Sequence, residues 1–188
     1  NDLFLDSDPS QQKLLHGMIA KQSVRIDRIV QDTLNMVKNK ETRPILIPLK
    51  HFMPQLIQDD LSDIQDKIQL NMREPVAIHF DEGQLRQVLI NLVRNAIRHN
   101  DPSTPYIELN IYPYQKYIHI DVRDFGLGVA EHDRSALFQP FFSTEITGTG
   151  LGLYLAHSFC EANQAQLTYV EQKEQGACFR VSCLAVTV

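Results

Sequence analysis

Mostly apolar residues recur at steps of three and four along the first forty positions, after a helix start at Asp8-Pro9-Ser10. The opposite face is polar and charged, so this stripe must be buried against other helices. We therefore predict an amphipathic helix of about eight turns that forms half of a helical hairpin. The stripe consists of Leu15, Ile19, Gln22, Ile26, Ile29, Thr33 and Val37.

Shorter elements with prolines at their edges follow a linker near residue 40. The pattern predicts a strand at 45–47 and a short helix at 53–61. Two apolar-rich runs at 68–72 and 76–80 are separated by a short turn. That arrangement indicates two strands paired with each other.

From Glu82 the apolar period becomes that of a helix with a broad buried face, and Pro102 ends it. The buried face comprises Leu85, Val88, Leu89, Leu92, Val93, Ala96 and Ile97. Strands follow at 107–111 and 118–122, then a helix at 151–161 and strands at 167–170 and 178–184. Helices that need a partner layer and strands with one apolar face predict an α/β sandwich, one sheet covered on one side by helices.

Composition narrows the classes of protein that this chain can be. A chain of 188 residues buries one good core, with enough left over for a helical extension. A formal charge of −5 argues against a nucleic-acid partner. Neither a signal peptide nor a membrane span is visible, and three cysteines without metal-ligand spacing are typical of a reduced, cytoplasmic protein.

Polar side chains on the helix after Glu82 are the first candidate for chemistry. Asn91 and Asn95 are four positions apart, and Arg98 and His99 lie one further turn on, so all four project from one stripe. A solvated helix surface would also produce such a stripe. Asparagine is a poor helix former, however, and a ligand-binding role would explain its cost at two positions.

Two glycine-containing turns are the second candidate. Asp124 directly follows a predicted strand, and Gly126 and Gly128 let the backbone approach a flat ligand, although an ordinary turn has the same composition. The run Gly148-Thr149-Gly150-Leu151-Gly152-Leu153 precedes a predicted helix. Exposed backbone N–H groups at a helix N-terminus bind phosphate oxygens. Neither the dinucleotide fingerprint nor the P-loop has this spacing.

In order and content, these motifs resemble those of bacterial sensor histidine kinases. The stretch 91–99 is similar to their N box, 124–128 to their first glycine box, 138–142 to their F box and 148–153 to their second glycine box. The resemblance covers roughly residues 44–188. Details around Tyr154 and Asn163 are similar to the pilus-regulating sensor kinases and their nitrogen-sensor relatives. The predicted helix at 10–38 resembles the second helix of the kinase dimerisation hairpin.

The resemblance implies a fold and a division of the chain. The fold is an α+β, two-layer sandwich of the Bergerat type, with a mixed sheet. Residues 1–40 would be part of a dimerisation hairpin, and residues 41–188 the catalytic ATP-binding domain.

The resemblance also implies a nucleotide site. Asn95, with Asn91, would hold Mg²⁺ on the triphosphate, Arg98 would contact phosphate and His99 would lie near the sugar or base. Asp124 would accept a hydrogen bond from the adenine amine, and Phe138 would anchor a lid. The implied nucleotide-binding set is Asn91, Asn95, Arg98, His99, Asp124, Gly126, Gly128, Phe138, Gly148, Thr149, Gly150, Leu151 and Gly152.

The implied reaction is transfer of the γ-phosphoryl group of ATP to a histidine of the hairpin, and from there to an aspartate of a response regulator. The parent protein would be a homodimer, attached to a membrane only through segments outside this sequence. None of the seven histidines has the context of the family's acceptor, and His16 is followed by Gly17. We therefore expect a fragment that binds ATP without normal autophosphorylation. Glu145, where many relatives have lysine, is expected to weaken nucleotide affinity.

Two other functions remain open on the sequence alone. Related ATPases activate water with a glutamate one turn before the metal-binding asparagine, a position that Asn91 occupies here, so hydrolysis is disfavoured. The second alternative is a degenerate kinase whose site senses nucleotide and serves as an interaction module.

Overall fold

The structure is a computed structural model that describes residues 12–20, 22–23, 42–144 and 148–186. Residues 12–20 and 22–23 are helical, and Leu14, Leu15, Met18 and Ile19 are exposed there. The rest of the predicted amphipathic helix lies outside the described residues. Within the described ranges, no helix is long and apolar enough to cross a membrane.

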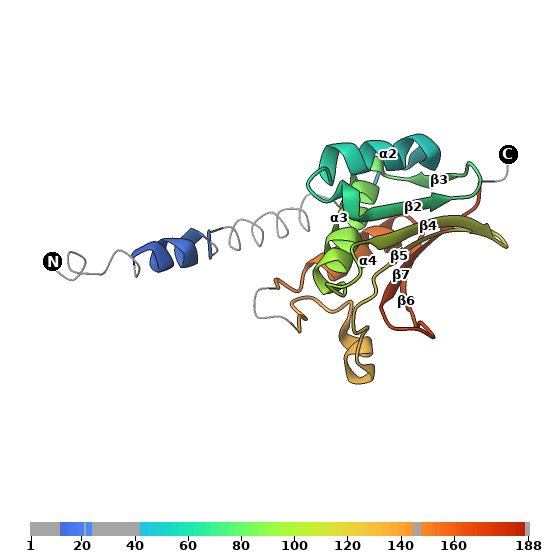
Figure 1. Cartoon of the computed structure of the whole chain (residues 1–188). Helices are drawn as coiled ribbons and strands as arrows, with labels where there is room; N and C mark the ends of the chain where they lie inside the picture. Colours follow the sequence, from blue (N-terminus) through green and yellow to red (C-terminus); the bar gives the residue numbers. More distant parts are fainter. Residues whose placement is uncertain (1–11, 21, 24–41, 145–147, 187–188) are drawn as a thin grey trace.

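The main sheet has five strands and is mixed (Figure 1). β2 pairs in parallel with β4, and all other neighbours are antiparallel. In spatial order the strands are β2 (Ile68–Met72), β4 (Ile107–Tyr114), β5 (Tyr117–Arg123), β7 (Cys178–Leu184) and β6 (Gln166–Val170).

A second, two-stranded sheet pairs β1 (Ile45–Pro48) with β3 (Ala77–Phe80) in antiparallel fashion. The predicted pairing of the runs 68–72 and 76–80 is therefore wrong, since β2 and β3 belong to different sheets. The alternation of apolar residues indicates which face of a strand is buried but not which strand lies beside it. Only contacts distant in sequence decide that.

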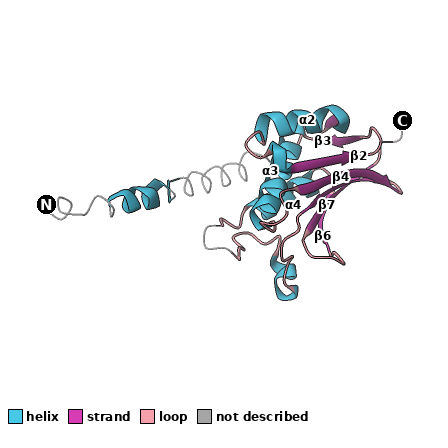
Figure 2. Ribbon diagram, in the orientation of Figure 1, coloured by secondary structure: helices cyan, strands magenta, loops and turns pink. Residues whose placement is uncertain are grey.

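The helices α2 (Leu49–Asp60), α3 (Glu82–His99) and α4 (Gly152–Ala162) pack with the sheets (Figure 2). α2 begins four residues before the predicted start, because Leu49, Phe52 and Met53 are buried and Pro54 is tolerated inside the helix. α3 begins where Asp81 accepts the N–H of Gln84. α4 follows the glycine-rich turn. The short 3₁₀ helices are η1 (Gln65–Lys67) and η2 (Glu131–Ala136).

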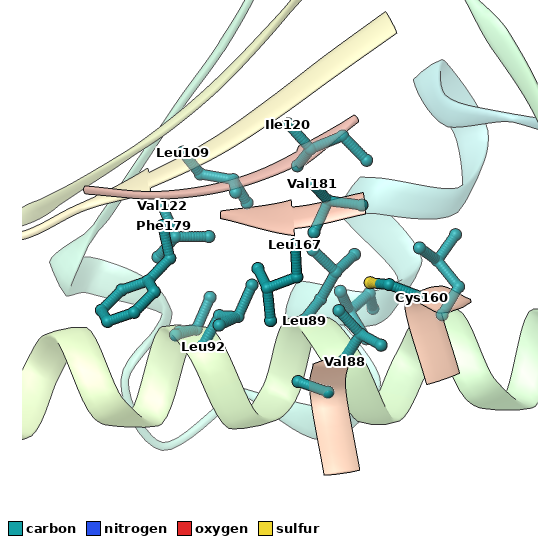
Figure 3. Packing of buried hydrophobic residues seen from close by; sticks show 14 of the residues in the cluster. Val88, Leu89, Leu92, Leu109, Ile120, Val122, Cys160, Leu167, Phe179 and Val181 are labelled. Carbon is teal, nitrogen blue, oxygen red and sulfur yellow. The ribbon is translucent and has the colours of Figure 1, made fainter. Parts of the chain in front are cut away.

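The core lies between α3, α4 and one face of the five-stranded sheet (Figure 3). α3 contributes Val88, Leu89 and Leu92, and the strands contribute alternate apolar side chains, all at most 3% exposed. These strand residues include Leu109, Ile120, Val122, Leu167, Phe179 and Val181. The predicted α+β sandwich with helices on one side of a mixed sheet is thereby confirmed.

The opposite face of the sheet carries polar side chains, and those at its centre, on β5 and β7, are buried or half-buried. Asp121 is 7% exposed and accepts two hydrogen bonds of 2.7 Å from the guanidinium of Arg180. Tyr112 donates to the same carboxylate over 3.0 Å, and burial raises the pKa of Tyr112 to about 12. β5 is therefore buried on both faces, by apolar packing on one and by this ion pair on the other.

Candidate functional site

A cavity of about 530 Å³ opens between α3, the loop after β5, η2 and the first residues of α4. Most of the residues singled out in the sequence line this cavity. They are Asn91, Asn95, Arg98, His99, Asp124, Gly128, Gly148, Thr149, Gly150 and Gly152. Phe142 of the stretch 138–142 also lines the cavity, so the structure brings together four sequence motifs, the first and last of which lie more than fifty positions apart.

Asp124 is the buried acid of the cavity, with a side chain that is 2% exposed. Its Oδ1 accepts the backbone N–H groups of Gly126 and Ala177, each over 3.0 Å. Both bonds use one oxygen, which leaves Oδ2 as the acceptor for a donor inside the cavity. Burial raises the pKa of Asp124, although the two N–H groups oppose this.

The turn after Asp124 depends on close backbone contact with α3. A Cβ at position 126 would overlap the carbonyl oxygen of His99, so only glycine fits there. Gly126 does not line the cavity, contrary to its predicted role as a contact residue. Its contribution is to bring the loop against the end of α3 and to donate its N–H to Asp124.

Asn91 and Asn95 lie one turn apart on α3, and both are half-buried at the cavity wall. Asn91 also lies against the start of α4, since a Cβ on Gly152 would be 3.7 Å from the Asn91 Oδ1. Any side chain larger than hydrogen at position 152 would therefore contact this amide. The asparagines and the helix N-terminus form one continuous polar wall.

The glycine-rich turn is joined to the F-box segment by backbone contacts. The N–H of Phe141 donates to the carbonyl of Gly150 over 3.0 Å, and Gly150 has a φ of +67°. A Cβ at position 150 would overlap the backbone of Phe141. Both the positive φ and the close approach require glycine at this position. Glu145, between these two residues, lies outside the described part of the chain.

Phe138 and Leu151 do not line the cavity either, and both belong to its supporting structure. The ring of Phe138 stacks on His157 of α4 at 4.9 Å and meets the edge of Phe179, itself a cavity residue, at 6.4 Å. Leu151 is fully buried. Sequence reasoning assigned both residues to the ligand because motif membership does not distinguish a lining side chain from one behind it.

A sequence model of the family described as histidine kinase-, DNA gyrase B-, and HSP90-like ATPase matches residues 80–187, more than half of the chain. The chain belongs to this family. All of the cavity residues described above fall within the matched segment.

Relatives of this ATPase-family chain are sensor kinases. The sensor protein kinase PilS of Pseudomonas aeruginosa is 31% identical over 175 residues, which is 89% of this chain and 33% of PilS. The chain therefore spans about a third of that relative. Sensor histidine kinase ZraS of Escherichia coli is 28% identical over 88% of this chain and 36% of its own length. The histidine kinase AdeS of Acinetobacter baumannii shares the fold, with a TM-score of 0.69 at 21% identity over 99% of this chain and 89% of that one.

The donor set of this family member suits Mg²⁺ held on a phosphate. Among the described residues, no group of three or more His, Cys, Asp or Glu side chains could hold a metal by itself. Mg²⁺ keeps several waters and is commonly bound through one or two protein oxygens plus substrate phosphates. The carboxamide oxygens of Asn91 and Asn95, on the wall next to the α4 N-terminus, fit that coordination.

Several cavity residues were missed by sequence reasoning. Val129, Leu137, Leu153 and Phe179 contribute apolar side chains to the wall, and Asp133 also lines the cavity. Leu137 and Leu153 border predicted motifs and Phe179 lies in a predicted strand, but none of these residues was assigned to the ligand. Ala177, which holds Asp124, lies 53 positions after it and has no local signal.

Proposed function

We propose that this chain is the ATP-binding catalytic part of a sensor histidine kinase, transferring the γ-phosphoryl group of ATP to a histidine of a dimerisation hairpin for relay to a response-regulator aspartate. The convergence of the α3 amides, the buried Asp124 and the glycine turn on one cavity supports this most directly. Sequence similarity to PilS over 89% of the chain supports it further.

The base end of the nucleotide lies at Asp124 in this proposal. The Oδ2 of Asp124 accepts a hydrogen bond from the exocyclic amine of adenine, while Oδ1 stays bound to Gly126 and Ala177. The apolar wall formed by Val129, Leu137, Leu153 and Phe179 packs on the flat base. A buried acceptor rejects a base that lacks the matching donor, because its desolvation would go uncompensated.

The phosphates lie at the N-terminus of α4. Free N–H groups and the helix dipole favour anions there, and α4 has no acidic residue in its first turn. Arg98 and Thr149 add positive charge and a hydroxyl to the same cavity. Asn95 and Asn91 hold Mg²⁺, which neutralises charge on the transferring phosphoryl group. The protein's contribution to phosphoryl transfer is chiefly the positioning of these groups.

The acceptor histidine and the dimer are also part of the proposal. Residues 1–40 belong to the dimerisation hairpin, and residues 41–188 are the ATP-binding domain. The exposed apolar side chains Leu14, Leu15, Met18 and Ile19 fit a helix that pairs with others. No histidine of this sequence has the acceptor's context, so the acceptor is supplied by a hairpin segment outside it.

A response regulator receives the phosphoryl group in this proposal. Support comes from the solved complex of histidine kinase ThkA with response regulator protein TrrA, whose fold matches 96% of this chain and 53% of that one, with a TM-score of 0.73 at 20% identity. The ATP-binding domain works on the cytoplasmic side, where ATP is available. Any membrane attachment of the parent lies in segments outside this sequence.

Calorimetric titration and a transfer assay test the proposal together. Mg-ATP is titrated into the chain, and the chain is then incubated with labelled ATP and a separately supplied hairpin carrying the acceptor histidine. We expect saturable binding of one ATP and acid-labile label on the hairpin alone. Binding without transfer would favour a nucleotide-sensing module, and absence of both would refute the assignment.

A further inference from the structure

Asn100 occupies the C-cap of α3 and makes three hydrogen bonds that join three separate segments. Its Nδ2 donates to the carbonyls of Thr104 and Tyr106, over 2.8 and 3.0 Å. Its Oδ1 accepts the N–H of Phe125 over 2.9 Å. The end of α3, the loop before β4 and the loop after β5 are thus held together by one side chain.

Only a carboxamide on a short stem supplies what these partners need. Two carbonyl oxygens require two donors, and one N–H requires an acceptor, and an asparagine amide supplies both donors and the acceptor in one orientation. A carboxylate would face two carbonyls without a donor. A hydroxyl is one atom shorter and offers a single donor.

The bond to Phe125 acts one residue from the buried acid of the site. Gly126 is pressed against the carbonyl of His99, and its N–H donates to Oδ1 of Asp124. Residues 99 and 100 therefore fix the two peptide units that follow Asp124. On the other side, the N–H of Ala177 donates to the same oxygen. The direction of Oδ2 follows from these constraints on the backbone and on Oδ1.

We propose that Asn100 is a positioning residue that fixes the orientation of the Asp124 carboxylate and so sets the preference of the cavity for a purine with an amine at C6. This inference rests on the function proposed above. Asn100 is not among the residues that line the cavity, so its effect on the ligand passes through Phe125, Gly126 and Asp124. Discrimination between bases, rather than overall affinity, is the property that it controls.

Asn100→Ala tests this in the full chain, with calorimetric titration of ATP, inosine triphosphate and tripolyphosphate. Inosine triphosphate carries a carbonyl oxygen where ATP carries the amine, and tripolyphosphate has no base. We expect the ATP-to-inosine-triphosphate affinity ratio to fall about tenfold, and tripolyphosphate binding to stay unchanged. A ratio that stays at the wild-type value would overturn the proposal and leave Asn100 as a helix cap only.

Asn163→Ala is the matched control. Asn163 also makes three hydrogen bonds, to the N–H of Asp81, the side chain of Gln84 and the carbonyl of Phe159, and it is buried at the opposite end of α3. Its loss is expected to lower the melting temperature at least as much, with the base ratio unchanged. If Asn163→Ala also lowers the ATP-to-inosine-triphosphate affinity ratio, the change in the ratio follows from lost stability, and the proposal is overturned.

A second variant and the wild-type comparison separate a failure of the proposed role of Asn100 from a failure of the proposed base site. Should Asn100→Ala not fold, Asn100→Ser replaces it, because serine also loses the bond to Phe125 but leaves a smaller void, and the same fall in the ratio is expected. If the wild-type chain binds ATP and inosine triphosphate equally, the assignment of the base to Asp124 fails first. If the wild type discriminates and the variants do so equally, only the role of Asn100 fails.

Discussion

The backbone N–H of Ala177 donates a 3.0 Å hydrogen bond to Oδ1 of Asp124, a residue 53 positions earlier in the chain. The reciprocal bond, from the N–H of Asp124 to the carbonyl of Ala177, measures 2.9 Å. Together they extend the pairing of β5 with β7 by one step beyond the sheet. The backbone of Asp124 therefore continues the ladder of β5 and β7, and its carboxylate accepts the other bond, from the same neighbour.

Asp124→Asn is expected to weaken ATP binding by at least about tenfold, because the amide presents a donor where the adenine amine needs an acceptor. Oδ1 of the asparagine still accepts the N–H groups of Gly126 and Ala177. Isothermal titration calorimetry with Mg-ATP measures the change. An affinity within twofold of the wild type would remove Asp124 from the proposed site.

Asp124→Asn is expected to weaken ATP binding but not to lower the stability of the ligand-free chain. Burial raises the pKa of Asp124 in the native state, so the native state binds this proton more tightly than the unfolded state does. The wild type therefore gains stability as the pH falls through that raised pKa and loses it as the pH rises. Asp124→Asn removes this dependence, and its free energy of unfolding at pH 7 is expected to equal or exceed that of the wild type in urea titrations.

Asn95→Ala is expected to reduce affinity for Mg-ATP more than affinity for ATP measured in excess chelator. The amide oxygen of Asn95 is proposed to act through the metal, so its effect depends on metal being present. Asn71→Ala is the control, since Asn71 is an exposed asparagine on β2 bonded to Asn110 over 2.9 Å. Equal losses with and without Mg²⁺ at Asn95 would argue for a direct contact with the nucleotide.

Gly150→Ala is expected to destabilise the turn before α4, because alanine at a φ of +67° costs about 1–2 kcal/mol and its Cβ overlaps the backbone of Phe141. Gly83→Ala is the matched substitution. Gly83 lies in the first turn of α3 with its nearest neighbour, Asp81 Oδ1, at 3.5 Å, so alanine is expected to stabilise by about 0.4–1 kcal/mol. Thermal unfolding of both variants gives the comparison, and similar melting temperatures would contradict it.

Arg180→Met is expected to cost about 3–5 kcal/mol, since it removes the guanidinium that pairs with the 7% exposed Asp121 on the polar face of the sheet. The double variant with Asp121→Leu is expected to recover much of this loss. Arg94→Gln, which breaks an exposed ion pair with Asp63, serves as the surface control with a much smaller effect. Urea unfolding gives all three values, and a loss at Arg180 no larger than that at Arg94 would contradict the prediction.

Local patterns in the sequence were sufficient for most of the architecture. α3 was predicted with its bounds because its apolar period begins at Glu82 and a proline follows its end, and the stripe of Asn91 and Asn95 follows from that helix. The start of α2 was missed because Pro54 suits a first helical turn, whereas buried Leu49 extends the helix. The partners of β2 and β3 were wrong because pairing depends on residues far along the chain.

The residues of the site also fall into two groups, those that a local motif indicates and those whose role depends on contacts distant in sequence. Motifs that bring their own turn or helix, such as the one at Gly150, were visible locally. The role of Ala177 depends on the pairing of β7 with β5, which no stretch of neighbouring residues encodes. Phe138 and Leu151 were assigned to the ligand although they support the wall from behind. Packing of the whole domain decides which side chains face a cavity and which lie behind its wall.

Asp81 and Asn100 fasten α3 at its two ends through bonds that do not involve the stretch between Phe141 and Gly150. Insertions, deletions or charge changes in that stretch can therefore accumulate without shifting the two amides on the helix. Such changes would alter one edge of the cavity while the two amides proposed to bind Mg²⁺ keep their positions.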